Sequence, residues 1–169
     1  MSPVSLVAIE PAEGDDTVRL QAAIDGLSAS GGGRVALMAG IHVCRGLQLR
    51  SDVDLHLAAG AILRPVADYE AYAHTSVSVI AEKSDRGMIV ARDARRISLT
   101  GAGRIEAGCD SFIVGDDETV GTFIPAEFRP RVVVFEGCDE VEISSVHISR
   151  SPMWTLHFVN CTDVVVSNV

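Results

Sequence analysis

Hydrophobic and polar positions alternate over short stretches along most of the chain. Apolar residues separated by one position recur as Val53 and Leu55, Ile97 and Leu99, Val141 and Ile143, and Val164 and Val166. A period of two places such side chains on one face of a β-strand, whereas an amphipathic helix needs apolar residues three and four positions apart. The pattern therefore predicts many short strands.

The strand unit is repeated along the chain. The stretch FEGCDEVEISSV, residues 135–146, aligns with FVNCTDVVVSNV, residues 158–169, at an offset of 23, with Phe, Cys, Val, Ser and Val at matching places. Moving back from Val141 by 44 positions reaches Ile97, and another 44 reaches Val53. The repeat lacks the L-x-x-L-x-L pattern of leucine-rich repeats, and nothing recurs every six residues. It favours short strands stacked in parallel register, as in a β-helix.

Residues at the expected bends support this fold. Asp93, Gly137 and Asn160 occupy equivalent positions, at spacings of 44 and 23. Asp, Gly and Asn tolerate a left-handed backbone better than other residues do. The same spacing predicts that Cys138 and Cys161 stack in adjacent coils with both side chains buried.

One helix, over about residues 16–28, is expected before the coils, which begin near residue 34. Asp15 or Asp16 suits its N-cap and first turn, and a run of Ser and Gly ends it. An amphipathic helix laid over the first coil would close the open end of the β-helix. Two apolar stripes are compatible with that position: Val18, Ala22 and Ile24, or Leu20, Ile24 and Leu27.

A glycine-rich stretch, GGGRVA at residues 31–36, matches the G-x-G-x-x-A pattern of dinucleotide-binding loops. That motif requires a strand before the loop and a helix after it. Here the predicted order is helix, loop and strand. The sequence therefore does not predict a nucleotide cofactor.

Composition narrows the class of protein. With 169 residues, 47% hydrophobic and 22% charged, the chain matches one soluble globular domain, and we expect residues 1–169 to form the N-terminal part of a single β-helix domain. No apolar run is long enough for a membrane span. The net charge of −9 argues against nucleic acid as a partner. The N-terminus has no basic region before an apolar one, which predicts a cytoplasmic location, or a secreted one if a signal peptide was removed.

The four cysteines form no C-x-x-C pair. Small buried thiols are favoured over disulfides or a zinc site. We expect no metal and no cofactor.

Three segments carry a family resemblance. They are residues 14–63, beginning GDDTVRLQAAIDG; residues 97–107, ISLTGAGRIEA; and residues 129–169, beginning RPRVVVFEGC and containing SPMWTLH. In this order they resemble the N-terminal portion of glycoside hydrolase family 28, the polygalacturonases and related pectin-cleaving enzymes of the pectin lyase-like superfamily. The resemblance implies a right-handed parallel β-helix with an N-terminal capping helix. The sequence departs from the family at residues 108–128.

The resemblance also implies an activity, which is inverting hydrolysis of a pectin-type polysaccharide by a group of aspartates. Those aspartates belong to N-T-D-G, D-D, G-H-G and R-I-K motifs, none of which this sequence contains in the family's order. One repeat beyond His157, the first of them would fall after Val169. We therefore expect an N-terminal fragment, truncated at its C-terminal end, that has no catalytic residues, is inactive alone and self-associates through its open last coil.

Two acidic pairs imitate catalytic carboxylates. Asp116 and Asp117, in GDDET, precede the RPR segment, whereas the family's pair follows N-T-D-G, so we expect them in an exposed loop. Asp15 and Asp16 are assigned to the start of the helix.

The candidate substrate-binding residues are His157 and Thr155. If Trp154, Leu156 and Phe158 point inward, alternation turns Thr155 and His157 outward, beside the next coil. A histidine there can hydrogen-bond a sugar hydroxyl or carboxylate. The remaining histidines have no such context and are expected to be solvated strand residues: His42, His56, His74 and His147.

Two alternatives remain. One is a non-catalytic β-helix that binds polysaccharide or forms a structural spike. The other is a pectate-lyase-like protein, which needs calcium held by carboxylates on a sheet face. No outward ladder of carboxylates occurs in the predicted strands, so the calcium-dependent alternative ranks last.

Overall fold

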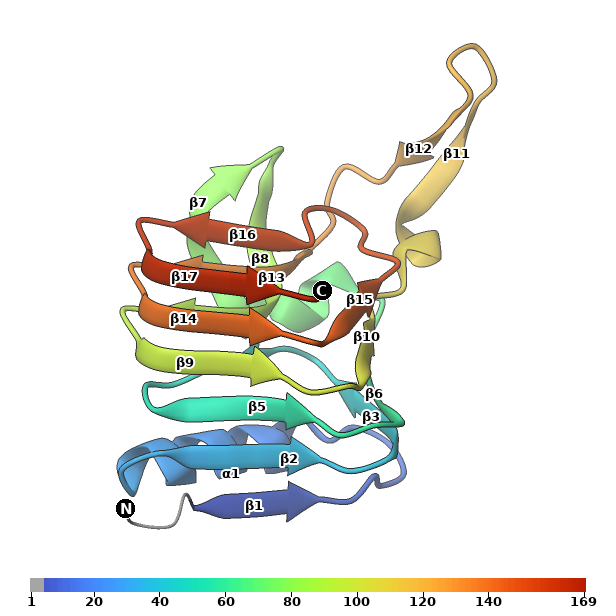
Figure 1. The fold of residues 1–169 in the computed structure, drawn as a ribbon. Helices are drawn as coiled ribbons and strands as arrows, with labels where there is room; N and C mark the ends of the chain where they lie inside the picture. The colour runs from blue at the N-terminus through green and yellow to red at the C-terminus, as the bar shows by residue number, and fades with distance from the viewer. Residues whose placement is uncertain (1–4) are drawn as a thin grey trace.

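Three parallel sheets surround a common interior, and successive turns of the backbone stack on one another (Figure 1). The structure, a computed structural model, describes residues 5–169. Sheet A has six strands in the spatial order β1 (Leu6–Ile9), β2 (Gly33–Leu37), β5 (Val53–Leu57), β9 (Arg95–Thr100), β14 (Asp139–Ser144) and β17 (Thr162–Ser167). Sheet B contains β3 (Gly40–Cys44), β6 (Ala61–Pro65), β10 (Arg104–Glu106) and β15 (His147–Ser149). Sheet C contains β4 (Leu47–Gln48), β8 (Ser84–Arg92), β13 (Arg131–Glu136) and β16 (Leu156–Val159).

Each turn passes from sheet A to sheet B to sheet C, so the fold is a parallel β-helix, as the repeat predicts. The register follows the sequence spacing. Val141 pairs with Val164 on one side and with Ile97 on the other, and Leu55 pairs with Leu99. The offsets of 23 and 44 are therefore the offsets between stacked coils.

The bends stack as well. Asp93, Gly137 and Asn160 all have left-handed backbones, with φ of 49°, 63° and 51°. The Asp93 amide donates to the Glu136 carbonyl at 2.9 Å, and the Gly137 amide donates to the Val159 carbonyl at 2.8 Å. The shared bend position expected from the sequence is confirmed.

The interior between the sheets is filled by the alternating apolar side chains. Leu55, Ile97, Leu99 and Ile143 are fully buried. Cys138 is also buried, and the Thr162 amide donates to its carbonyl from the next coil. Cys161 stacks as expected but is only half-buried, because no coil of the described chain covers it. All four cysteines are free thiols.

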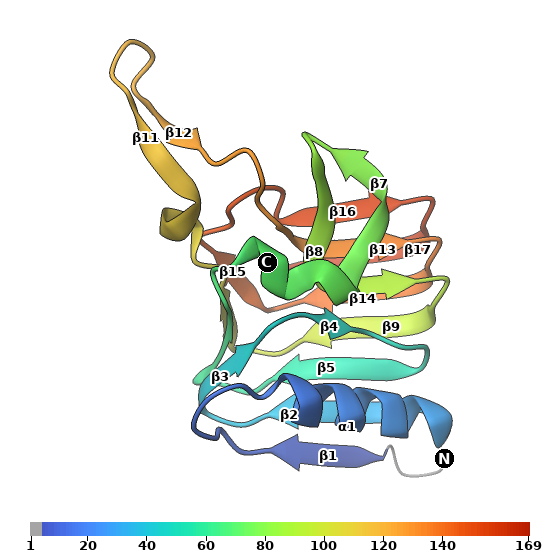
Figure 2. The same ribbon diagram turned by 180° about the vertical axis from the view of Figure 1, so that it is seen from behind.

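Helix α1 (Thr17–Ala29) lies along β2 and below β4 (Figure 2). Its buried residues are Leu20, Ile24 and Leu27, which is the second of the two expected stripes. The Gln21 side chain accepts from the Gln48 amide at 2.8 Å and donates to the Gln48 carbonyl at 2.9 Å. The helix thus satisfies backbone groups of β4 that no neighbouring strand pairs.

At the start of the helix, one of the two expected aspartates binds a helix amide. Asp15 accepts from the Thr17 amide at 2.9 Å, whereas Asp16, at the N-cap position, makes no capping bond. Asp16 is buried and contacts two basic side chains, Arg19 at 2.7 Å and His42 at 3.2 Å. His42 lies in β3 but is fully buried, and its Nε2 lies 2.9 Å from the Met38 carbonyl, so the expectation that it is solvated was wrong.

Two antiparallel hairpins interrupt the coils. The first pairs β7 (Ser76–Ala81) with the start of β8 and follows a 3₁₀ segment, η1 (Tyr69–Thr75). The second, called the arm, pairs β11 (Ile113–Asp117) with β12 (Thr122–Pro125) and follows η2 (Cys109–Phe112). The arm projects away from the stacked sheets (Figure 1).

The GDDET motif lies in the arm, where Asp116 and Asp117 end β11 rather than forming the expected loop. Asp116 is exposed. The Asp117 carboxylate accepts from the Thr119 amide at 2.9 Å and thereby supports the turn at the arm's tip. We therefore assign Asp117 a structural role at this turn.

Within residues 5–169, no helix is long and apolar enough to cross a membrane.

Candidate functional site on the outer face of sheet C

The candidate site begins at His157, in the last strand of sheet C. Leu156 and Phe158 pack against the interior, so His157 faces outward, as alternation predicts. In the register, His157 pairs with Val134 of β13, which pairs with Val90 of β8. The histidine therefore lies at the edge of a row of outward side chains.

Two side chains hold the imidazole of His157. Arg131 Nη1 lies 2.9 Å from Nδ1 of His157. The Trp154 ring lies against the imidazole, with centroids 4.4 Å apart and planes tilted by 53°. Burial and the charge of Arg131 both lower the pKa of His157, and together they outweigh the opposing effect of Glu136. The imidazole of His157 therefore stays neutral down to a lower pH than an ordinary histidine does.

Trp154 does not share the inward face with Leu156 and Phe158, so that expectation was wrong. Its side chain remains 45% exposed, on the outer side of the coil with His157. The strand alternation begins only at Leu156, the first residue of β16, and Trp154 lies before it. Periodicity could not place a residue outside the strand.

Thr155 is half-buried in the segment that leads into β16. Its hydroxyl donates to the Ser151 Oγ at 2.9 Å, and its carbonyl accepts from the Val133 amide at 3.0 Å. No hydrogen bond joins it to His157 in the described part of the chain. The structure thus brings His157 together with Trp154 and Arg131 rather than with Thr155.

Arg131 is the site residue that sequence reasoning missed. Its side chain is fully buried, and Nη2 donates to the carbonyls of Val79 at 2.7 Å and Ser84 at 3.0 Å. No carboxylate forms an ion pair with it among residues 5–169. Burial lowers the pKa of Arg131, against the opposing effect of Glu136. The segment RPR was visible in the sequence, but nothing in the periodicity indicated a buried arginine.

Glu136 lies at the other end of β13 and is nearly buried. Its carboxylate accepts from the Ser78 amide at 2.9 Å, the Ser78 hydroxyl at 2.6 Å and the Val79 amide at 3.0 Å. Arg92 adds an ion pair at 3.0 Å. Burial alone would raise the pKa of Glu136, but these hydrogen bonds outweigh it and lower the pKa. Such a carboxylate stays ionised and fixed, which suits an anchor for β7 better than a general acid.

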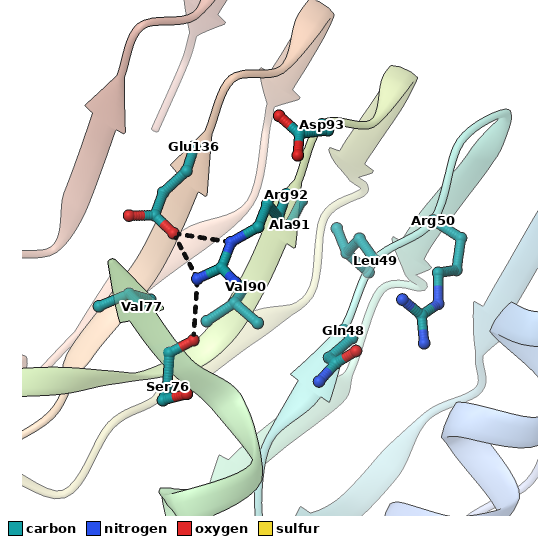
Figure 3. A pocket seen from close by; sticks show the side chains of 10 residues that line it. All are labelled: Gln48, Leu49, Arg50, Ser76, Val77, Val90, Ala91, Arg92, Asp93 and Glu136. Atoms are coloured by element: carbon teal, nitrogen blue, oxygen red, sulfur yellow. Dashed lines mark hydrogen bonds and ion pairs between the residues drawn. The ribbon is translucent and has the colours of Figure 1, made fainter. Parts of the chain in front are cut away.

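A cavity of about 310 Å³ opens between β7, β4 and β8 (Figure 3). Arg92 lies at its edge, where it pairs with Glu136 and reaches the Ser76 carbonyl at 3.5 Å (Figure 3). Polar side chains form much of its lining: Gln48, Arg50, Arg92, Asp93 and Glu136. Amide, guanidinium and carboxylate groups suit a hydroxyl-rich ligand. Within residues 5–169, no three His, Cys, Asp or Glu side chains gather closely enough to hold a metal ion.

Solved structures share this architecture. A hyperthermoactive exopolygalacturonase from Thermotoga maritima superposes with a TM-score of 0.78 at 20% identity, over 97% of this chain and 46% of its own. A family 28 exopolygalacturonase from Yersinia enterocolitica gives 0.76 at 18%, over 98% of this chain and 38% of its own. A candidate glycosyl hydrolase from Parabacteroides merdae gives 0.74 at 21%, over 96% of this chain and 75% of its own.

No family model and no curated protein matches the chain by sequence. The structural likeness nevertheless shows the fold, which is a polygalacturonase-like parallel β-helix. It spans less than half the length of the two exopolygalacturonases.

Proposed function

We propose that this chain forms the N-terminal coils of a glycoside hydrolase that acts on pectin-type polysaccharide by inverting hydrolysis. The observation that carries the proposal is the superposition on an exopolygalacturonase over 97% of this chain. A fold does not by itself fix a function, so the proposal also rests on the outer face of sheet C. There, a polar cavity and a half-exposed tryptophan suit a carbohydrate.

Inverting hydrolysis needs one carboxylic acid and one carboxylate, separated widely enough to admit water. On sheet C, Glu136 is fully engaged by Ser78, Val79 and Arg92. Asp116 and Asp117 lie on the projecting arm. We therefore place the catalytic carboxylates on coils that follow β16, beginning about one coil, or roughly 4.8 Å, beyond His157.

In this proposal His157 and Thr155 contact the substrate beside those carboxylates. His157 supplies a hydrogen bond to a sugar oxygen. Trp154 offers one face for stacking against a sugar ring, because its side chain is 45% exposed. Thr155 contributes through its hydroxyl, which has Ser151 as its partner in the free protein.

A second candidate function is a non-catalytic β-helix that binds polysaccharide or forms a structural spike. The lack of a free pair of carboxylates on sheet C among residues 5–169 favours it. A spike would also use the free edge of β17, where Val165 and Val166 are 58% and 44% exposed. We expect the 169-residue chain to self-associate through this edge, which sedimentation at several concentrations would measure.

The deciding experiment is a reducing-sugar assay on polygalacturonate. It compares the purified 169-residue chain with a longer chain that carries several more coils. We expect hydrolysis only from the longer chain. Activity in neither would favour the binding or spike alternative.

A matched variant tests the acidic pair of the arm. The double substitution Asp116→Asn with Asp117→Asn should leave the longer chain fully active. Hydrolysis by the 169-residue chain that disappears in this variant would overturn the placement of the catalytic carboxylates on later coils.

A further inference from the structure

Arg131 has an unusual set of partners for a buried cation. Its three observed contacts are two carbonyl oxygens, of Val79 and Ser84, and the Nδ1 atom of His157. Its Nε has no partner among the described residues. A guanidinium has five N–H donors and no acceptor, and it stays protonated in proteins. Every atom that it contacts must therefore act as an acceptor.

This requirement fixes the proton on His157. Nδ1 lies 2.9 Å from Arg131 Nη1, so Nδ1 must offer its lone pair. In a neutral imidazole with Nδ1 unprotonated, the proton is on Nε2. Nε2 makes no hydrogen bond to the described part of the chain. It is also not among the fully buried side-chain atoms that lack a partner, which are Ser84 Oγ and Arg131 Nε. It therefore reaches solvent as a free donor.

The surroundings oppose a second proton on the ring. A proton on Nδ1 would point at the N–H groups of Arg131 and place two positive charges side by side. Glu136 is the carboxylate whose charge acts in the other direction, and it is neutralised by Arg92. The lowered pKa of His157 agrees with this geometry.

We infer that Arg131 is a positioning residue, which holds His157 as a neutral imidazole with its Nε2–H directed outward as a donor to an oxygen atom of a bound sugar. Trp154 stacks on the same ring and restricts its rotation. The identity of the ligand rests on the proposed function, whereas the assignment of the proton does not.

A purely structural role for Arg131 is the competing explanation, because the same guanidinium contacts both strands of the β7–β8 hairpin at Val79 and Ser84. Such a role would need only the two carbonyls. The state of the imidazole therefore separates the two explanations.

The first test is nitrogen NMR of the full chain with ¹⁵N-labelled histidine. His157→Gln identifies the His157 signals by their loss. We expect an unprotonated Nδ1 and a protonated Nε2, with no imidazolium at pH values where free histidine is already half charged, about 6.5. A protonated Nδ1, or an equal mixture of tautomers, overturns the inference. This measurement needs no variant of Arg131.

The second test compares Arg131→Met with Arg92→Met. Both arginines help to hold the β7–β8 hairpin, but only Arg131 contacts His157. We expect Arg131→Met to mix the tautomers of His157 and Arg92→Met to leave them unchanged. Equal effects would show that loosening of the hairpin, rather than the Arg131 contact, controls the ring.

The third test concerns the ligand, with trigalacturonate and neutral galactotriose as probes. We expect either sugar to shift the His157 ring signals and His157→Leu to weaken binding about tenfold. His157→Gln, which keeps a neutral N–H donor, should recover most of that loss. If neither sugar moves the signals while the tautomer is as expected, the proposed sugar site is wrong and the assignment of the proton still stands.

Discussion

The β7–β8 hairpin and the arm are both antiparallel insertions between coils, yet they differ in how they are held. In the hairpin, Val77 is 7% exposed and packs on Val90 and Val134. In the arm, Val114 and Val120 are each 68% exposed. The hairpin has its own small apolar cluster against the outside of sheet C, and the arm has none.

The hydrogen bonds that hold the β7–β8 hairpin and the arm differ in the same way. Glu136 of β13 binds two backbone amides of β7, and Arg131 binds carbonyls of both strands of the hairpin. At the base of the arm, the carbonyl of buried Phe112 accepts from the Ala126 amide at 2.7 Å and so joins the two sides of the arm, while the Cys109 amide donates to the Arg150 carbonyl of the body at 2.8 Å. An isolated two-stranded hairpin is marginally stable in water. The comparison teaches that an insertion gains a fixed position from the residues of the coil beneath it rather than from its own pairing.

The largest expected effect comes from a matched pair of substitutions. Phe135→Ala removes a fully buried ring that packs on Phe158, with centroids 6.0 Å apart, and should lower the free energy of unfolding by about 3–5 kcal/mol. Phe123→Ala, in the arm, removes a ring that is 62% exposed and should change it by less than about 0.5 kcal/mol. Urea unfolding measures both. A comparable loss from Phe123→Ala would mean that the arm packs on the body.

The next effect concerns the anchor of the β7–β8 hairpin. Glu136→Gln removes the negative charge to which five donor groups hydrogen-bond and should weaken the hairpin by about 2 kcal/mol. Hydrogen exchange at the Ser78 and Val79 amides reports it directly, because both donate to this carboxylate. Glu118→Gln, at the exposed tip of the arm, is the control. Unchanged protection of Ser78 in Glu136→Gln would contradict the anchoring role.

Acid should open the same hairpin. The pKa of Glu136 is lower in the folded chain than in the unfolded chain, because hydrogen bonds from Ser78 and Arg92 outweigh burial. The unfolded state therefore binds the proton first, and the stabilisation is complete above the ordinary glutamate pKa, about 4.3. It is lost as the pH falls below that value through the folded pKa.

Hydrogen exchange of β7 as a function of pH would detect this loss of protection. Glu136→Gln should remove most of the acid dependence at Ser78 and Val79. If the wild-type dependence persists in that variant, another group is responsible.

The smallest effect is expected from removing most of the arm. Replacing residues 114–124 with an Asn-Gly turn keeps Ile113 and Pro125, which pair at the base of the arm. The free energy of unfolding of the coils should change by less than about 0.5 kcal/mol. A loss of more than about 2 kcal/mol would show that the arm supports the coils.

Much of the stack of coils could be predicted because the pattern of apolar and bend residues repeats from coil to coil. Val141, Ile97 and Val164 pair at the offsets that the sequence contains, and each residue sees nearly the same surroundings in every coil. The bends at Asp93, Gly137 and Asn160 follow the same offsets. The insertions interrupt the period, and there the sequence led to wrong expectations, such as a loop at GDDET.

Only part of the candidate site could be predicted from the sequence, because not all of its residues lie within the periodic strands. Alternation along β16 correctly predicted that His157 faces outward. Trp154 lies before the strand, where alternation does not predict the direction of a side chain. Arg131 approaches His157 from the neighbouring coil, 26 positions away in the sequence. No local pattern connects these three residues.

The sequence by itself determined the parallel stack, its register and the positions of its bends, because those depend on spacing and on alternation within short strands. The tertiary structure decided which polar groups became buried together. Asp16 meets His42 across 26 positions, and Glu136 meets Ser78 across 58. Burial makes an unpaired polar group costly, so each of these partners is selected by the folded surroundings of both groups, and a sequence pattern describes the surroundings of only one.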